Sequence, residues 1–390
     1  MEEKKIRLGV FGCYRGSAIA ACAKIAGAEI VAACDSNPKM IERIKPHLAE
    51  DGVIYDNFDE FINHEMDGCI VANYYCEHVP YAIRLLEKGI SVLSECAAAI
   101  TMAQCVELVR AVEASSAKYM LVENYPYSAA CQELKRVYQS GSIGRVVYAE
   151  GEYVHPMSVK EHTGLAPTPD HWRNHIPPTY YNTHSLGPIM HVTEAMPLSI
   201  SSQAVSRPEI HEGTLAQNDP FALMMCKMSD GSVISFSAWA QMGGHGHWYR
   251  INGTKGAAEI TRYDPHRIRV VYNGYDRPED QPRDSVYAPE FPFDADKAKK
   301  CGHAGGDYYI AHQFLEVIEG KREPFFNVYR ATAMAACGIL GWRSCLEGGK
   351  VYQIPDFRRE EDKKMYENDH ISPFCKEDGT TDIPATLGEK

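Results

Sequence analysis

The sequence predicts an α/β fold in two parts: an N-terminal, doubly wound parallel sheet, and a C-terminal α+β domain with an open, mainly antiparallel sheet. Up to about residue 125, short apolar strands alternate with helices, which is the pattern of a parallel sheet covered on both faces. Beyond that point strands follow strands, and Asp230-Gly231 and Asn252-Gly253 are pairs that favour hairpin turns. We therefore expect domains over residues 1–125 and 126–365, followed by a polar tail over 366–390.

The first strand, turn and helix form the most informative segment. An apolar strand over 6–12 leads into a turn over 13–16 and a helix over 17–26, and a second strand over 28–34 ends before Asp35. Glycines let a diphosphate approach a helix N-terminus, and an acid about 20 residues later can hold ribose hydroxyls. This order predicts a Rossmann-type dinucleotide site, although Tyr14 replaces the middle glycine of the motif. The alternative is a tight turn in another parallel α/β fold. The candidate cofactor residues here are Gly9, Gly12, Cys13, Tyr14, Arg15, Gly16 and Asp35.

The alternation of strands and helices continues to about residue 122. Helices are expected over 38–48, 80–88 and 102–115, and buried strands over 69–72, 90–93 and 119–122. Ligands of such sheets lie at the carboxyl ends of the strands, so the residues that follow the strands should line one crevice. These residues are Asn73, Tyr75, His78, Glu95, Cys96, Glu123 and Asn124.

The second half reads as a different kind of domain. A helix over 128–140 precedes strands over 146–153, 221–228, 232–240 and 248–252. Residues 274–300 read as a surface loop, and helices follow over 308–319 and 330–346. The last 25 or so residues read as a tail or an arm that packs on a partner chain. An open sheet face commonly requires a partner, so we expect a homo-oligomer formed through this sheet.

Composition narrows the class of protein. The 390 residues carry a net charge of −12, which argues against partners such as nucleic acid and anionic membranes. The start of the chain shows no apolar core of a signal peptide, and no apolar run is long enough to span a bilayer. The thirteen cysteines contain no C-x-x-C pair and read as reduced, buried thiols, so we expect a cytoplasmic protein.

Histidines are concentrated between residues 153 and 191. His171 and His175 have the spacing of two metal ligands on a helical turn, but prolines crowd this stretch, and no carboxylate or thiolate completes a set. We therefore expect no metal and favour a substrate site of Tyr and His groups, in which His162 and His175 are surface or packing residues. The six histidines are His155, His162, His171, His175, His184 and His191.

The sharpest motif in this region is the segment 182–188, Asn-Thr-His-Ser-Leu-Gly-Pro. A neutral imidazole at His184 can take a hydroxyl proton while a hydride leaves the same carbon. Tyr181, three residues earlier, can donate a hydrogen bond or stabilise an oxyanion. A loop that simply starts a helix is compatible with either role.

The chain resembles the Gfo/Idh/MocA oxidoreductases over nearly its whole length. The runs 253–260 (GTKGAAEI) and 302–308 (GHAGGDY) are similar to the G-T-K-G turn and the glycine-rich segment of that family. The family usually has Glu-Lys-Pro where this chain has Glu95-Cys96-Ala97, so the lysine that assists proton transfer is absent. A branch that also lacks it, the NAD-dependent glycosidases of glycoside hydrolase family 109, matches this chain in short motifs at residues 95–99, 123–124, 151–155, 172–173 and 181–188.

The resemblance implies the following roles. Tyr75, His78, Glu95, Cys96 and Asn124 would contact NAD, with Trp172 near the nicotinamide, and Tyr153, Arg173, Tyr181, Asn182, Thr183 and His184 would hold a sugar. The catalytic candidates are His184, Tyr181, Tyr153, His155 and Glu123. The implied activity is NAD-dependent oxidation of a sugar or glycoside at a ring hydroxyl, which we expect to be that on C3, as a first step of redox-neutral glycosidic cleavage. Two alternatives stay open: a dehydrogenase that stops at the keto sugar, and a catalytically inactive NAD-binding regulator.

Overall fold

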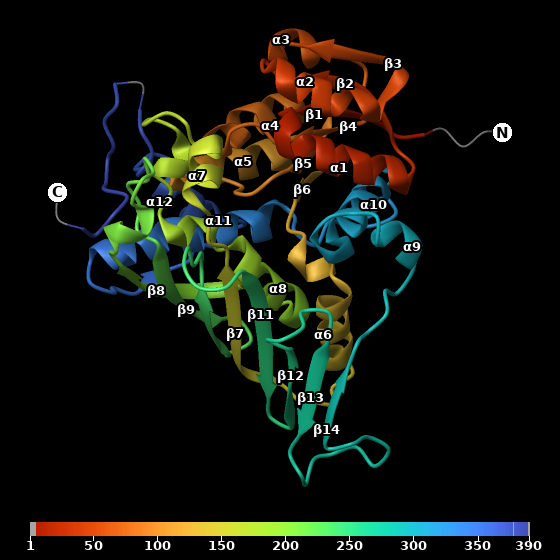
Figure 1. Cartoon of the computed structure of the whole chain (residues 1–390), viewed down its shortest axis with the longest axis vertical. Helices are drawn as coiled ribbons and strands as arrows, with labels where there is room; N and C mark the ends of the chain where they lie inside the picture. The colour runs from red at the N-terminus through yellow and green to blue at the C-terminus, as the bar shows by residue number, and fades with distance from the viewer. Residues whose placement is uncertain (1–4, 377, 389–390) are drawn as a thin grey trace.

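The N-terminal sheet has six parallel strands in the order β3-β2-β1-β4-β5-β6 (Figure 1). The structure is a computed structural model that describes residues 5–376 and 378–388. The strands of this sheet are β1 (Arg7–Phe11), β2 (Glu29–Cys34), β3 (Leu48–Tyr55), β4 (Gly68–Val71), β5 (Ser91–Ser94) and β6 (Tyr119–Leu121). The helices between them are α1 (Cys13–Ala26), α2 (Pro38–Ile44), α3 (Phe58–Phe61), α4 (His78–Glu87) and α5 (Met102–Ala114). The predicted doubly wound fold is confirmed.

Strand β3 was not predicted. It pairs with β2 at the edge of the sheet and is half-exposed over its length. Its middle, Glu50-Asp51-Gly52, is polar, so this strand lacks the apolar run by which the buried strands were identified. The predicted helix over 38–48 is correspondingly shorter and ends as α2 at Ile44.

The second sheet has nine strands in the order β14-β13-β12-β11-β7-β10-β9-β8-β15, and only β7 and β10 among these described neighbours pair in parallel. Its strands are β7 (Val146–Val154), β8 (Pro197–Val205), β9 (Phe221–Met228), β10 (Val233–Ser237), β11 (Gly246–Gly253), β12 (Gly256–Ile260), β13 (Ile268–Tyr272), β14 (Asp284–Tyr287) and β15 (Tyr352–Gln353). The helices are α6 (Ala129–Gln139), α7 (Val159–Leu165), α8 (Thr183–Thr193), α9 (Ala295–Ala298), α10 (Gly306–Ile318), α11 (Val328–Leu346) and α12 (Glu360–Tyr366).

Two local predictions in this sheet were wrong. Asn252 and Gly253 belong to strand β11, and the hairpin turns at Thr254 and Lys255. Gly253 is required by packing, because a Cβ there would lie 2.1 Å from the carbonyl oxygen of Ile143. The expected loop over 274–300 contains strand β14 and helix α9, which are too short to show a periodic pattern.

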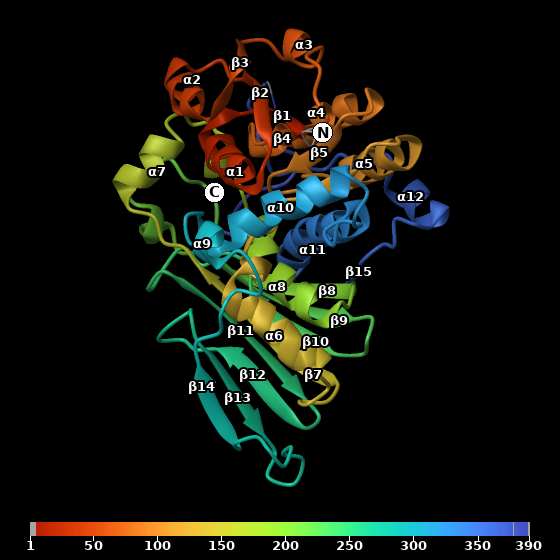
Figure 2. The ribbon, with the colours of Figure 1, turned by 90° about the vertical axis from the view of Figure 1, so that its right-hand side faces the viewer.

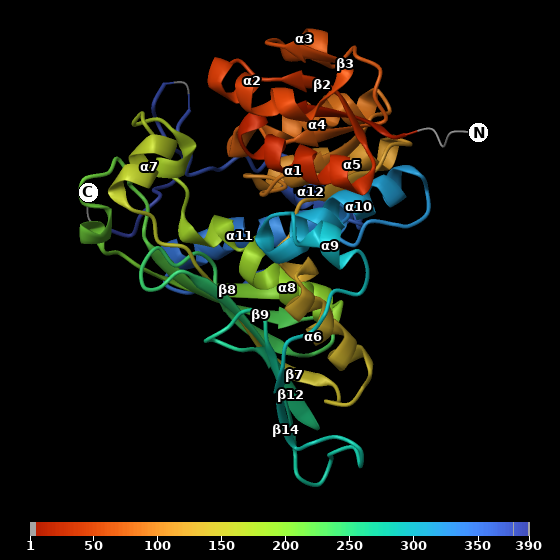
Figure 3. The ribbon, with the colours of Figure 1, turned by 45° about the vertical axis from the view of Figure 1, so that its right-hand side comes forward.

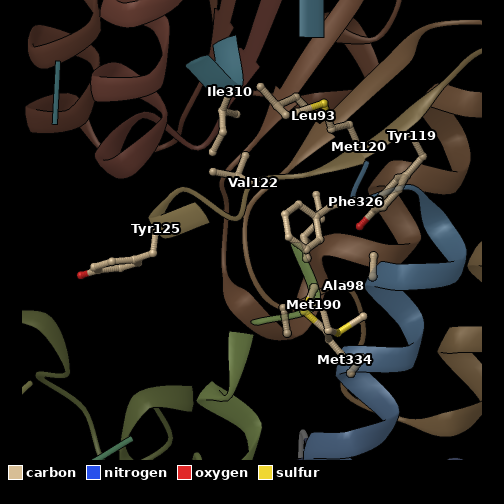
Figure 4. Packing of buried hydrophobic residues seen from close by; sticks show 14 of the residues in the cluster. Leu93, Ala98, Tyr119, Met120, Val122, Tyr125, Met190, Ile310, Phe326 and Met334 are labelled. Atoms are coloured by element: carbon tan, nitrogen blue, oxygen red, sulfur yellow. The ribbon is translucent and has the colours of Figure 1, made fainter. Parts of the chain in front are cut away.

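Helices α6, α8 and α11 cover one face of the second sheet, and the opposite face is bare (Figure 3). Helices α10 and α11 lie between the two sheets (Figure 2), where α10 packs on α1 and α11 packs on α5. The buried apolar residues form one continuous cluster through both parts of the chain. Figure 4 shows Ala98 from the N-terminal part close to Phe326, Met190 and Met334 from the C-terminal part. The two parts of the chain therefore share one packed core at their junction.

The C-terminal segment packs on its own chain rather than extending away. The Arg343 guanidinium makes two hydrogen bonds of 2.6 and 2.7 Å to Asp369, and the indole of Trp342 donates to the carbonyl of Pro384 at 2.7 Å. The described residues are thus no free tail, and packing of this segment on a partner chain stays a prediction. Within the described residues, no helix combines the length and the apolar composition that crossing a membrane requires.

A buried histidine in α8 makes stability depend on pH. His191 packs against Tyr127 and Phe325, and burial, with the nearby cations Lys135 and Arg330, holds its pKa well below the usual 6.5. As pH falls through 6.5, the unfolded chain binds a proton that the folded chain does not bind, so the free energy of unfolding falls.

We expect His191→Phe to make the dependence of unfolding free energy on pH shallower between about pH 5 and 7. Denaturant titrations at several pH values measure this slope. His266→Phe, at an exposed position, is the matched control and should leave the slope unchanged. An unchanged slope in His191→Phe would contradict the assignment.

Candidate active site

The turn between β1 and α1 fits a dinucleotide. Gly12 has φ 86°, and a Cβ there would lie 2.3 Å from the backbone nitrogen of Asn73, so only glycine allows this approach. Helix α1 begins at the next residue, and its N-cap residue, Gly12, supplies no side-chain cap to the first-turn N–H groups. Its first-turn N–H groups are therefore placed as in sites that bind diphosphate.

The other glycines of the turn have packing roles. A Cβ at Gly9 would lie 2.4 Å from the sulfur of Met66, and one at Gly16 would lie 2.7 Å from Val10. The thiol of Cys13 is buried, so only its backbone can serve a cofactor. The ring of Tyr14 is 52% exposed and carries the guanidinium of Arg43 at 5.0 Å, so the residue that replaces the middle glycine points outward.

Asp35 is fixed at the end of β2. Its carboxylate accepts hydrogen bonds from the backbone N–H groups of Cys13 at 2.7 Å and Asn37 at 2.8 Å. The acid that we expect to hold the ribose is therefore held beside the glycine turn by the backbone itself.

Arg15 connects the cofactor turn to the C-terminal part. Its guanidinium bonds Glu95 at 2.9 Å and Asp307 of α10 at 2.6 Å, and it lies 3.3 Å from His303. Burial alone would raise the pKa of Asp307, but the hydrogen bond from His303 and the charge of Arg15 hold it far below its usual range. Asp307 also accepts from the side-chain amide of Asn124 at 3.2 Å. Asp307 thus fixes the side chains of Arg15 and Asn124, two of the expected cofactor residues.

Two amide oxygens at the strand ends have no partner. Asn73 Oδ1 and Asn124 Oδ1 are buried and make no hydrogen bond in the described part of the chain. Buried acceptors of this kind are normally satisfied, and donors on a nicotinamide or a ribose would satisfy them. His78 differs, because its two ring nitrogens face the carbonyls of Ala97 at 3.1 Å and Asn73 at 3.3 Å. His78 therefore shapes the loops beneath the site.

An aromatic wall stands on the other side of the strand ends. Trp172 stacks on Tyr75 with ring centroids 4.9 Å apart at 14°, and the guanidinium of Arg173 lies 4.5 Å above Trp172. The Tyr75 hydroxyl donates to the carbonyl of Tyr180 at 2.8 Å. Tyr75 and Trp172, expected at the cofactor, and Arg173, expected at the sugar, therefore form one continuous stack.

The centre of the site is a buried Glu–His pair. His184 Nδ1 lies 3.0 Å from one carboxylate oxygen of Glu123 and 3.2 Å from the other, and Glu123 is fully buried. The Tyr249 hydroxyl donates to the His184 carbonyl at 2.6 Å and fixes the backbone. Nε2 has no hydrogen-bond partner among the described residues and is not fully enclosed. A carboxylate that holds one nitrogen orients the other toward a substrate.

Three tyrosines surround this imidazole. The ring centroids of Tyr153, Tyr125 and Tyr181 lie 4.8, 4.9 and 5.3 Å from that of His184. Burial raises the pKa of Tyr153 well above its usual range and that of Tyr181 to about 12, so both hydroxyls stay protonated near neutral pH. They can donate hydrogen bonds to a sugar oxygen or a developing oxyanion.

Further histidines line the same region. The ring centroids of His155 and His245 lie 4.7 Å apart. Burial, and then the charge that His245 can carry, lower the pKa of His155. His247 contacts Tyr125 at 4.8 Å, and burial lowers its pKa to about 4. The buried Nδ1 of His155 has no partner among the described residues, so it is available to a ligand.

Two residues of the 182–188 motif serve structure. The Asn182 side-chain amide donates to the carbonyls of Thr179 at 2.9 Å and Met334 at 3.0 Å, and only 1% of this residue is exposed. Thr183 donates its hydroxyl to the Cys96 sulfur at 3.4 Å. The structure uses these donors to hold the start of α8, and the expected contacts of both residues with a sugar stay predictions.

Cys96, Glu123 and His184 form a cluster that the sequence analysis did not foresee. Their potential ligand atoms all lie within 4.8 Å of one another, close enough to share a cation. The cluster is internally bonded: the thiol donates to the carbonyl of Val122 at 3.0 Å, and His184 pairs with Glu123. Burial, and then the charges of Glu123 and Glu95, raise the pKa of Cys96 well above its usual range, so the group is a neutral thiol.

The histidine pair considered as a metal site has other partners. His171 Nδ1 accepts from the backbone N–H of Arg173 at 3.2 Å, and His175 Nε2 lies 2.7 Å from the carbonyl of Pro169. His162 Nε2 lies 2.8 Å from the Asn174 side-chain oxygen and is buried. Packing roles for His162 and His175 are thus supported.

Comparisons with known proteins agree with this geometry. The model of the oxidoreductase family with an NAD-binding Rossmann fold matches residues 6–123, the GFO/IDH/MocA C-terminal domain matches 131–259, and the C-terminal domain of glycosyl hydrolase 109 matches 248–364. The chain is 25% identical to an alpha-N-acetylgalactosaminidase of Tannerella forsythia, over 86% of this chain and 82% of that protein. It is 24% identical to a glycosyl hydrolase family 109 protein of Parabacteroides distasonis, over 92% and 88%.

A solved levoglucosan dehydrogenase in complex with NADH and L-sorbose superposes with a TM-score of 0.77 at 16% identity, over 91% of this chain and 100% of that chain. That likeness supports the fold. The family matches lead to one identification: the chain is an NAD-binding enzyme that belongs to the Gfo/Idh/MocA oxidoreductase family and is similar to proteins of glycosyl hydrolase family 109.

Proposed function

We propose that the protein oxidises a ring hydroxyl of a sugar or glycoside, with His184 as the base that takes the hydroxyl proton. The observation that carries this proposal is the bond between His184 Nδ1 and the buried Glu123, which leaves Nε2 without a partner among the described residues. When bound, NAD supplies the hydride acceptor. Glu123 orients the imidazole and stabilises it when it becomes charged.

The tyrosines are proposed to control the oxygen that loses its proton. Tyr153 and Tyr181 are protonated near neutral pH, so each can donate a hydrogen bond to the substrate oxygen. Arg173 and His155 are proposed to hold other substituents of the ring. The Arg173 guanidinium has no carboxylate partner among the described residues, and it stacks on Trp172.

We further propose oxidation at C3 and glycosidic cleavage. A ketone at C3 acidifies the C–H at C2, and loss of that proton expels the aglycone from C1 as an alcohol and leaves a C1–C2 double bond. Water then adds to C1 as C2 takes back a proton, and return of the hydride to C3 restores the ring hydroxyl of the free sugar. This route needs no pair of catalytic carboxylates of the usual kind. Support comes from the alpha-N-acetylgalactosaminidase among the relatives and from Cys96, which replaces the usual family lysine. The second candidate is a dehydrogenase that stops at the keto sugar.

Incubation with a panel of glycosides separates these outcomes when absorbance at 340 nm and product mass are followed together. Released aglycone without net NADH means glycosidase, and NADH with a product lighter by two hydrogens means dehydrogenase. No change with any member of the panel, with NAD binding retained, would favour a catalytically inactive protein.

Cys96 is expected to be a packing residue. Its thiol is buried, neutral and bonded to the Val122 carbonyl, so it supplies neither a charge nor a base. Cys96→Ser and Cys96→Ala should retain most activity, and Cys96→Lys should not improve it, as measured by steady-state kinetics. Dialysis against a chelator should leave activity unchanged. Loss of activity in both small replacements, with substrate protecting one thiol from alkylation, would make Cys96 a working residue.

We propose that two copies associate through the bare face of the second sheet. Leu223 and Met225 project from this face of β9 and are 50% and 53% exposed, which is unusual for such side chains in the middle of a sheet. Met225→Glu should shift the species seen by light scattering toward monomer. Met365→Glu, on α12 and 70% exposed, is the control. A wild-type monomer at micromolar concentration would contradict this proposal.

A further inference from the structure

The described residues of the C-terminal segment, 369–376 and 378–388, contact the aromatic wall through Phe374. Its start is fixed twice: the Asp369 side chain bonds Arg343 of α11, and its carbonyl accepts from the Ala103 backbone of α5 at 2.9 Å. Its end is fixed by buried Asp219, which accepts from the Thr386 hydroxyl at 2.6 Å and the Leu387 backbone at 2.8 Å. Figure 1 shows this segment rising beside α7. The segment is therefore anchored at both ends.

Between these anchors, Phe374 contacts the wall. Only 5% of Phe374 is exposed, and its ring lies 6.0 Å from Tyr75 and 5.5 Å from Tyr180, the latter edge-to-face at 84°. Tyr75 is in turn stacked on Trp172 and bonded through its hydroxyl to Tyr180. Phe374 thus packs behind the ring that supports Trp172.

The next residue holds the loop that carries Trp172. The Cys375 sulfur lies 3.2 Å from Nε2 of His175, which also faces the Pro169 carbonyl. His175 follows Trp172 and Arg173 by three and two residues. The segment therefore contacts Tyr75, which follows β4, and His175, which lies in the 169–181 loop.

We infer that Phe374 is a positioning residue for Trp172 and Arg173, and that residues 369–376 are a built-in part of the active site. Without the Phe374 ring, Tyr75 loses the packing that keeps it parallel to Trp172. The inference rests on the proposed place of Trp172 beside the nicotinamide and the sugar. A small displacement of such a wall costs catalysis without touching the base.

The test compares Phe374→Ala and Phe374→Leu with Ile371→Ala, a truncation three residues away at a 43% exposed position. We expect Phe374→Ala to lower kcat/KM by about tenfold or more, mainly through KM, with the pH profile of kcat unchanged because His184 and Glu123 are untouched. Phe374→Leu should restore most of the loss, because it returns apolar volume behind Tyr75. Ile371→Ala should match wild type.

Energy transfer from tryptophan to bound NADH provides a readout that does not need turnover. The variant Trp172→Phe measures the energy transfer that comes from the other three tryptophans. Phe374→Ala, at saturating NADH and with a Tm near wild type, should lose part of the Trp172 contribution. Unchanged kcat/KM and transfer in Phe374→Ala would overturn the inference, as would losses that merely follow a lower folded fraction. If no glycoside reacts with wild type, the proposed function fails while the transfer experiment still decides this inference.

Discussion

His184→Ala is expected to lower turnover by about 10²-fold or more while leaving NAD affinity unchanged. The imidazole contacts the buried carboxylate of Glu123 through Nδ1. Removal of the side chain takes away the proton acceptor but does not alter the cofactor turn at Gly12 or Asp35. Steady-state kinetics and NADH titration measure the two quantities separately.

Glu123→Gln is the companion variant. It keeps the size of the side chain but removes the negative charge that stabilises a protonated His184, so we expect turnover to fall about tenfold or more. Near-normal turnover in His184→Ala would show that the base lies elsewhere, and His155 would be tested first because its Nδ1 is buried without a partner among the described residues.

The second large effect expected is discrimination between NAD and NADP. Asp35 is held beside the glycine turn by hydrogen bonds from the backbone N–H groups of Cys13 and Asn37. Its carboxylate is therefore fixed where the 2′-phosphate of a bound NADP would lie. Ser36, Asn37 and Pro38 are neutral, and Lys39 is the first cation. Like-charge repulsion should make NADH bind about 10²-fold more tightly than NADPH.

Titration of the protein with each reduced cofactor measures this ratio by fluorescence. Asp35→Ser should narrow it, mostly by improving NADPH binding. Tighter binding of NADPH than NADH by the wild-type protein would contradict the assignment of Asp35.

The elements that were predictable from the sequence are those whose local pattern matches their place in the fold. Buried strand β4 is a continuous apolar run, and β9 is apolar except for Lys227 and ends just before the Asp230-Gly231 turn. Strand β3 was missed because it lies at an edge and contains Glu50-Asp51-Gly52. The hairpin turn was wrongly predicted at Asn252-Gly253. Gly253 is instead needed for close packing against the carbonyl oxygen of Ile143, which is more than a hundred residues away in sequence.

The residues at the strand ends and in the 182–188 motif could be predicted from the sequence. The contacts between these residues could not. Glu123 follows strand β6, and His184 lies in helix α8. The hydrogen bond between them depends on how the two parts of the chain pack together. The same holds for Asp307, which binds Arg15 across 292 positions, and for Tyr125 and His247 beside the imidazole. A polar residue that follows a glycine-rich segment, as Asp307 does, was the available signal.

The measurement that tests the central claim most directly is transfer of a label from the sugar ring to the cofactor. The most active glycoside of the panel, deuterated at C3, is mixed with NAD and an excess of enzyme and quenched within one turnover. The proposed chemistry predicts reduced cofactor that is heavier by one mass unit, and a strongly diminished yield with His184→Ala. Reduced cofactor without deuterium would place the oxidation at another carbon, and aglycone release with no reduced cofactor at any time would contradict oxidation as the first step.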